Sequence, residues 1–250
     1  MPITGTLDLS PRVADAPLMP NLDTEPWELP RVEMLYATFE IDDSDIAALV
    51  PKALHPNVPP TVTLLTMRVP ESPVGPFMLA QVRVGCRAGT FQRGLLTRAY
   101  CDSDAAIKEL GERWGFDAHS GMVELDRGYD RIVGRVEADG ELILEYSGVD
   151  PLPISGSDLR YVDNLNLARV ERDGKEVPRL IQVDPTYVFH TADRATPEIA
   201  VFDPDAWAAE TVAPVYPVSA SFTVADVTLP KLRYIIDPDT SALSGGTERL

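Results

Sequence analysis

The sequence is poor in cysteine, histidine and lysine, and each shortage removes a class of chemistry. Its two cysteines, Cys86 and Cys101, are too few for a disulfide framework or a four-thiolate metal site. Its 3 histidines include no pair at helical ligand spacing, and the glycine motifs that bind phosphates or dinucleotides are absent. We therefore expect no metal ion and no standard cofactor.

Positive charge is also scarce. The sequence has 22 basic and 39 acidic residues, so its formal net charge is −17. A surface with this charge repels nucleic-acid phosphates and anionic lipids. No apolar run approaches the roughly 18 residues of a membrane-spanning helix, and residues 1–20 lack the pattern of a signal peptide. The sequence thus predicts a cytoplasmic protein that binds a small molecule, with no nucleic-acid partner and no membrane partner.

The chain is predicted to form one domain with two irregular ends. Residues 1–30 carry six prolines and little periodicity, which favours an extended N-terminal arm. Residues 239–250 contain Ser244-Gly245-Gly246 and are expected to form a flexible tail. Because no repeat or linker interrupts residues 31–238, we expect a single domain there.

Most of this domain is predicted to be β-structure, because β-branched and alternating apolar runs dominate it. The runs cover residues 34–41, 62–69, 77–87, 94–101, 122–126, 132–137, 141–148, 161–170, 176–191, 197–202 and 218–236. The Asp-Gly pairs at 139–140 and 173–174 are typical of hairpin turns. The sequence therefore predicts an α+β fold of mainly antiparallel strands that closes as a barrel.

Few helices are expected. The clearest covers residues 104–114, between Ser103 as the N-cap and Gly115 as the stop signal. Its apolar positions recur on one face, which predicts packing against the sheet. Two shorter helices are predicted over residues 43–49 and 204–210.

Four segments carry a family resemblance through their order and spacing. They are residues 100–107, the helix with its turn up to Gly121, residues 199–204 and residues 220–230. In these segments the sequence resembles the acetoacetate decarboxylase family, over roughly residues 36–237. The resemblance implies a closed, cone-like antiparallel barrel with an apolar pocket, assembled as a homo-oligomer, and a lysine that forms a Schiff base with a β-keto acid.

The sequence departs from that family at its reactive residues. The family's two adjacent lysines correspond to Ala118 and His119, and its two pocket glutamates correspond to Leu64 and Leu79. Alanine cannot form an imine, and leucine cannot move a proton. We therefore expect a divergent member that lacks the Schiff-base lysine, while the resemblance still places these four residues and Gly121 at the pocket.

Other cations are candidates for the pocket or for the surface. The family's pocket arginine falls on or beside Val32, so Arg31 takes its place only with a shift of register. Lys108 is predicted to pair with Glu112 on the solvated helix face. The remaining lysines are expected at the surface: Lys52, Lys175 and Lys231.

Strand alternation gives a prediction about the pocket wall. In residues 77–87 the even positions are apolar, while Leu79, Gln81 and Arg83 share the odd face. We expect this odd face to meet a ligand. In the alternative arrangement it meets bulk water, and the apolar face fills the barrel.

The next strand poses the same choice. Arg98 and Tyr100 share a face, so both point inward or both point outward. An inward arginine in an apolar cavity would need an anion, and a substrate carboxylate is the obvious partner. Trp114 and Phe116 flank the following turn, where they are expected to form the core at the barrel end or to line the pocket mouth.

Two classes of function remain open. In the first, the protein is a cofactor-independent lyase or isomerase in which His119 is the general acid or base, and an arginine holds a small carbonyl or carboxylate compound. Its reaction would be decarboxylation without an imine, retro-aldol cleavage, hydration or isomerisation. In the second, Leu64 and Leu79 make an apolar cavity that binds a small hydrophobic ligand without chemistry. A third possibility takes the acid or base from Glu198 or His190.

Overall fold

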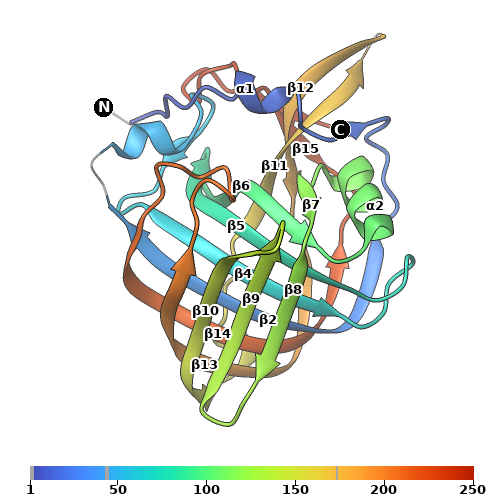
Figure 1. Cartoon of the computed structure of the whole chain (residues 1–250). Coiled ribbons are helices and arrows are strands. Elements are labelled where there is room, and N and C mark those ends of the chain that lie inside the picture. Colours follow the sequence, from blue (N-terminus) through green and yellow to red (C-terminus); the bar gives the residue numbers. More distant parts are fainter. Residues whose placement is uncertain (1–2, 43–44, 173) are drawn as a thin grey trace.

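One large curled sheet dominates the structure, a computed structural model that describes residues 3–42, 45–172 and 174–250 (Figure 1). The helices and 3-10 turns are α1 Ser10–Val13, α2 Asp104–Trp114, η1 Ile46–Leu49 and η2 Gly156–Asp158. The strands are β1 Leu18–Met19, β2 Trp27–Ile41, β3 His55–Pro56, β4 Thr61–Val69, β5 Phe77–Ala88, β6 Phe91–Cys101, β7 Ala118–Ser120, β8 Met122–Arg127, β9 Arg131–Ala138, β10 Glu141–Pro153, β11 Asp163–Arg172, β12 Lys175–Val183, β13 Thr186–Phe202, β14 Pro214–Leu229, β15 Tyr234–Ile236 and β16 Thr247–Arg249.

The sheet is mixed but mainly antiparallel. Its strand order is β16-β15-β12-β11-β6-β5-β4-β2-β14-β13-β10-β9-β8, with β1, β3 and β7 attached to its side strands. The parallel pairs among the described residues are β1 with β11, β11 with β6 and β6 with β7. The predicted α+β fold with few helices is therefore confirmed.

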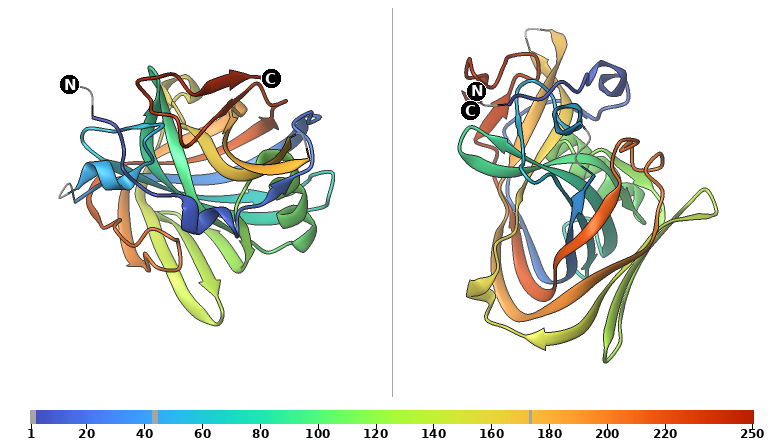
Figure 2. Two further views of the ribbon diagram at one scale, coloured as in Figure 1. Left: turned by 90° about the horizontal axis from the view of Figure 1, so that it is seen from above. Right: turned by 90° about the vertical axis from the view of Figure 1, so that its left-hand side faces the viewer.

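The predicted closure of the barrel is wrong. In the described residues the end strands β8 and β16 do not pair with each other. The sheet instead curls so that β8, β9 and β10 cross over β2, β4 and β5, and the right-hand view of Figure 2 shows these two layers on opposite sides of the interior. The strand β8 packs its side chains Val123 and Leu125 between the layers, and Arg68 of β4 donates a hydrogen bond to the Leu125 carbonyl.

The helix α2 forms where the sequence predicts it. The Ser103 side chain accepts a hydrogen bond from the Ala106 amide at the N-terminus, and Gly115 adopts the left-handed conformation with φ 68° at the C-terminus. A side chain is disfavoured at this φ, so glycine suits the position. Leu110 and Trp114 are buried against the sheet.

The predicted hairpins also form. Asp139 and Gly140 take positive φ values between β9 and β10, and Arg172 pairs with Lys175 between β11 and β12. Asp173 of the second turn lies outside the described residues. The predicted strand 176–191 is divided, because β12 ends before Asp184-Pro185 and β13 begins after it.

Two of the expected short elements differ from the prediction. Residues 204–210 form turns rather than a helix, and Ala208 there has a positive φ of 48°. The predicted helix 43–49 is a 3-10 turn from Ile46 to Leu49, and its residues 43 and 44 lie outside the described residues. The N-terminal arm packs more closely than expected, since Met19 is buried and β2 begins at Trp27.

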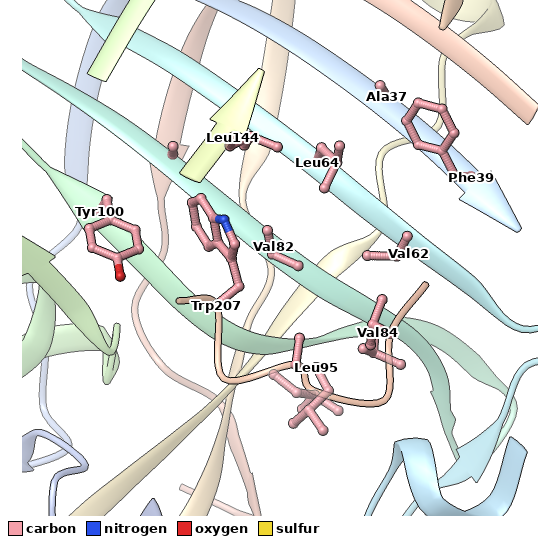
Figure 3. Close-up of a cluster of buried hydrophobic side chains, with 14 of the residues drawn as sticks. Ala37, Phe39, Val62, Leu64, Val82, Val84, Leu95, Tyr100, Leu144 and Trp207 are labelled. Atoms are coloured by element: carbon pink, nitrogen blue, oxygen red, sulfur yellow. The ribbon is translucent and has the colours of Figure 1, made fainter. Parts of the chain in front are cut away.

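Two apolar clusters cover the two faces of the central strands. The interlayer cluster fills the space between the layers and includes Leu64, Val82, Leu95, Tyr100, Leu144 and Trp207 (Figure 3). The helix-side cluster lies on the opposite face and includes Leu65, Met67, Leu79, Leu110, Trp114 and Phe116. Because strand side chains alternate, both faces of β4 and β5 are buried.

Candidate functional site

A narrow cavity of about 30 Å³ lies within the helix-side cluster. Its wall is mostly apolar and is made by Leu29, Leu65, Met67, Val69, Phe77, Leu79, Gln81, Arg83, Leu110, Phe116, Asn164, Pro185, Tyr187, Val227 and Leu229. Within this wall only Pro185 and Tyr187 are partly exposed, and the others are buried. The cavity therefore opens toward solvent at the turn between β12 and β13.

Polar side chains enter this wall from β5 because of strand alternation. Leu79, Gln81 and Arg83 occupy successive odd positions and all line the cavity. Gln81 is 3% exposed and Arg83 is 2% exposed. These values exclude the alternative in which the odd face of the strand meets bulk water.

Arg83 is a buried cation with neutral partners. Its Nη1 donates to the Val162 carbonyl at 2.9 Å and to Asn164 Oδ1. Its guanidinium carbon lies 5.3 Å from the centre of the Tyr36 ring, a cation–π contact. Its Nε is buried without a hydrogen-bond partner, and no described carboxylate lies within 4.0 Å of it. A buried charge without a counter-ion is costly, so the arrangement favours an anion at this point.

Asn164 and Gln81 extend the polar end of the cavity. The Asn164 Nδ2 donates to Gln81 Oε1 at 2.9 Å. Gln81 Nε2 lies 3.9 Å from the Met67 sulfur, which is a weak acceptor. Asn164 is itself buried, so these amides are held inside the protein.

Tyr187 stands at the cavity mouth. Its ring stacks on Phe189 with centroids 5.8 Å apart and meets the edge of Tyr161 at 5.3 Å. Its hydroxyl has no hydrogen bond to the described residues. Burial raises the pKa of this phenol above its ordinary range, so it stays protonated at physiological pH.

The cavity wall contains one charged group. The described residues that line it include no aspartate, glutamate, histidine or lysine, and Arg83 is the single cation among them. In the described ranges no three His, Cys, Asp or Glu side chains lie together as a metal site would need. The wall thus offers an arginine, two amides and a phenol, which can bind oxygen atoms and donate a proton.

The predicted leucines separate in the structure. Leu79 lines the cavity, but Leu64 belongs to the interlayer cluster on the other face of β4. Leu65 takes the place expected for Leu64. A shift of one residue in register reverses the direction of a strand side chain, which accounts for the difference.

Ala118 and His119 lie on opposite sides of β7. Ala118 pairs with Ala99 of β6 and packs on the helix-side cluster without lining the cavity wall. His119 pairs with Tyr100, and the two rings are 6.1 Å apart. His119 Nε2 lies 3.0 Å from Asp117 Oδ1. The structure therefore does not bring His119 together with Arg83.

Other predicted pocket residues also lie elsewhere. Arg98 Nη1 and the Tyr100 hydroxyl both donate to the Ala206 carbonyl, at 2.9 and 2.8 Å, on the interlayer side. Arg31 is exposed at a bulge of β2 with a positive φ of 57°, and its amide donates to Asp226. The bulge turns its side chain away from the core.

The barrel-end residues divide between core and cavity. Trp114 is fully buried and donates from Nε1 to the Pro230 carbonyl at 2.8 Å, whereas Phe116 lines the cavity. Gly121 lies against the Tyr100 ring, where an added Cβ would come within 2.9 Å of it. Gly121 therefore supports the packing of Tyr100 and not the cavity wall.

No lysine reaches the cavity wall. Lys52, Lys108 and Lys231 form ion pairs with Asp239, Glu112 and Asp23 at the surface, and Lys175 is exposed in a hairpin. The remaining predicted acid–base candidates also lie at the surface. Glu198 pairs with Arg131, and His190 pairs with Asp226.

Sequence reasoning missed two polar residues of the wall. Asn164 alternates with Leu165 in β11, and a buried amide in such a strand was a usable signal. Tyr187 follows a proline turn and gave no distinguishing signal. Asn164 and Tyr187 reach the same cavity as Gln81 and Arg83 only through the packing of strands that are distant in sequence.

Comparisons with known proteins agree with this fold. The family model for acetoacetate decarboxylase matches residues 15–238. An acetoacetate decarboxylase structure has a TM-score of 0.74 at 18% identity, covering 86% of this chain and 91% of that one. Acetoacetate decarboxylase from Legionella pneumophila has a TM-score of 0.73 at 20% identity, covering 85% and 88%.

A third similar structure has a different name. The enduracididine biosynthesis enzyme MppR complexed with pyruvate has a TM-score of 0.67 at 14% identity, covering 91% of each chain. No curated protein sequence matches the chain significantly. Among the described residues, no helix is long and apolar enough to cross a membrane.

Proposed function

Because the chain belongs to the acetoacetate decarboxylase family, we propose that it is a lyase that decarboxylates a small, largely apolar 3-oxo acid without a lysine Schiff base. The observation that carries this proposal is the buried cation Arg83, which faces an apolar cavity with no carboxylate partner. The enolate oxygen that forms when the substrate loses CO₂ would supply the missing negative charge. The pyruvate complex of the similar enzyme MppR supports an oxo acid as ligand.

The composition of the wall favours decarboxylation over the other reactions considered. Retro-aldol cleavage, hydration and isomerisation each need a base to remove a proton. The part of the wall that the structure describes has no carboxylate, imidazole or amine to do so. Decarboxylation of a 3-oxo acid removes no proton, because the electrons of the breaking C–C bond move into an enolate.

Arg83 and Gln81 would hold the ketone oxygen of the substrate. When the bond to the carboxylate carbon breaks, CO₂ leaves and negative charge grows on that oxygen. A donor aimed at this oxygen binds the transition state more tightly than the substrate. The apolar part of the wall, which includes Leu65 and Leu79, would hold the departing carboxylate away from water.

Tyr187 would complete the reaction as the proton donor. The enolate carbon takes the phenol proton, the product ketone forms, and the phenolate recovers a proton from water. The pKa of Tyr187 is raised by burial, so the phenol is protonated before each turnover. Its position at the mouth allows exchange with solvent.

A binding protein without chemistry is the second candidate. The cavity volume of about 30 Å³ favours this candidate, because a cavity of this size admits only a few atoms in this conformation. Such a protein would bind small carboxylates through Arg83 and leave 3-oxo acids intact.

Release of CO₂ from acetoacetate and 3-oxopentanoate separates these candidates. We expect catalysis by the parent protein, no inactivation by borohydride added with substrate, and a loss of about 100-fold in kcat for Tyr187→Phe with KM unchanged. Rates equal to those of buffer would overturn the lyase proposal. Inactivation by borohydride with a lysine adduct would overturn the claim that no Schiff base forms.

A further inference from the structure

The direction of each hydrogen bond at the polar end of the cavity is fixed by Arg83. An arginine only donates, so the Asn164 atom that meets Arg83 Nη1 must be Oδ1. The other end of the Asn164 amide is then Nδ2, which only donates. Gln81 must therefore present Oε1 to Asn164.

This chain of bonds leaves Gln81 with its nitrogen free. Gln81 Nε2 meets only the Met67 sulfur, at 3.9 Å, and sulfur is a weak acceptor. Arg83 Nε is likewise buried without a partner. Gln81 and Arg83 thus offer unused donors at one end of the cavity, and the one acceptor atom of the pair, Gln81 Oε1, already accepts from Asn164 Nδ2.

We propose that Asn164 is the residue that determines ligand specificity in this cavity, because it holds Gln81 and Arg83 as donors and so restricts the site to ligands with anionic acceptor oxygens. The inference rests on the proposed function, since it concerns the same cavity. It assigns Asn164 a positioning role, because its two amide atoms are occupied by Arg83 and Gln81.

The substitution Asn164→Asp would reverse this preference in two ways. The new carboxylate would form an ion pair with Arg83 and cancel its positive charge. Its second oxygen would accept from Gln81 Nε2, so Gln81 would turn and present Oε1 to the cavity. The polar end would then favour a neutral ligand with an N–H group.

Acetate and acetamide form a suitable pair of ligands for the test. Acetate has the shape of the acetone enolate and carries only acceptors, whereas acetamide is neutral and carries donors. In a titration followed by ligand-detected NMR, we expect the parent to bind acetate at least tenfold more tightly than acetamide. For Asn164→Asp we expect acetate affinity to fall at least 30-fold, with acetamide affinity within threefold of the parent.

Two further variants complete the test. Asn57→Asp makes the same chemical change at a buried asparagine outside the cavity wall and should keep the preference for acetate. If Asn164→Asp does not fold, Gln81→Glu tests the same idea, because its free carboxylate oxygen would face the ligand. The affinity of this variant for acetate should also fall, while its affinity for acetamide should not.

The outcomes distinguish this inference from the proposed function. If the parent prefers acetate and a folded Asn164→Asp keeps that preference, the role of Asn164 is wrong and the cavity assignment stands. If the affinities of Asn164→Asp for acetate and acetamide fall equally, Asn164 has a merely structural role, and this result would also overturn the inference. If the parent binds neither ligand, both the inference and the proposed anion site at Arg83 fail.

Discussion

Arg83 and Arg93 are buried arginines on neighbouring strands, but only Arg93 meets carboxylates. Arg93 of β6 contacts Asp163 and lies 3.2 Å from Asp184, while Arg83 of β5 has a carbonyl, an amide and an aromatic ring as its neighbours. The protein therefore pairs Arg93 with carboxylates of its own, whereas Arg83 has none within 4.0 Å among the described residues. In the proposed function, Arg83 is the arginine that meets the negative charge of the ligand.

The two arginines should differ in their effect on stability. Arg93→Met would leave two partly buried carboxylates without their cation, at a cost of about 3 kcal/mol. Arg83→Met would strand no carboxylate, and its lost hydrogen bonds should cost about 1 kcal/mol. Urea unfolding of both variants measures the difference, and an equal or larger loss for Arg83→Met would contradict it.

Glycine at the end of α2 should be required for two reasons. Gly115 has φ 68°, and an added Cβ would lie 2.9 Å from Ala168 Cβ and 3.2 Å from Ile181 Cγ1. Gly115→Ala should therefore cost about 1–2 kcal/mol for the backbone and about as much again for crowding. Gly140→Ala is the matched control, because its φ is 81° and no atom lies within 4 Å. Thermal unfolding should show the larger loss for Gly115→Ala, and equal losses would refute the packing argument.

Both thiols should be unreactive in the folded protein. Burial raises the pKa of Cys86 to about 12 and that of Cys101 to about 11, so almost no thiolate is present at pH 8. Iodoacetamide at this pH should label neither cysteine in the native protein and both in guanidinium chloride. Rapid labelling of the native protein at either cysteine would contradict the buried positions.

Stability should fall in alkali because of buried phenols. Burial raises the pKa of Tyr161 to about 12, against the opposing effect of its hydrogen bonds to Ser221 and Thr223. Below pH 10 the folded and unfolded phenols are both protonated, so Tyr161 adds no pH dependence there. Between pH 10 and 12 only the unfolded chain loses the proton, which lowers the free energy of unfolding by about 1.4 kcal/mol per pH unit.

The variant Tyr161→Phe isolates this contribution. It loses two hydrogen bonds and should be less stable at pH 9, but its free energy of unfolding should fall less steeply between pH 10 and 12 than that of the parent. Urea titrations at several pH values provide the comparison. Parallel pH profiles for the two proteins would contradict the assigned cause.

Local sequence signals predicted where a helix and a hairpin form, whereas the way the sheet curls was determined by the pairing of distant strands. The cap residues Ser103 and Gly115 set the ends of α2, and Asp139-Gly140 set a hairpin, because each signal acts over a few residues. The closure of the sheet depends on where β8 packs after a chain of pairings. No local pattern specifies that choice.

The candidate site was predictable in part for the same reason. Period-two alternation placed Leu79, Gln81 and Arg83 on one face, which the structure places in the cavity wall. The family resemblance does not fix strand register, and a shift of one residue moves the expected pocket position from Leu65 to Leu64. The direction of His119 depends on β7 pairing with β6 in parallel, which the sequence of a three-residue strand does not encode.

The most direct test of the central claim is the affinity of acetate for the parent protein and for Arg83→Met, measured by ligand-detected NMR with acetamide as the neutral reference. If Arg83 binds the anion in the cavity, the substitution should lower the affinity for acetate at least tenfold. The affinity for acetamide should stay within threefold of that of the parent. Equal acetate affinity in the two folded proteins would show that Arg83 does not recruit an anionic ligand, and the proposed function would fail with it.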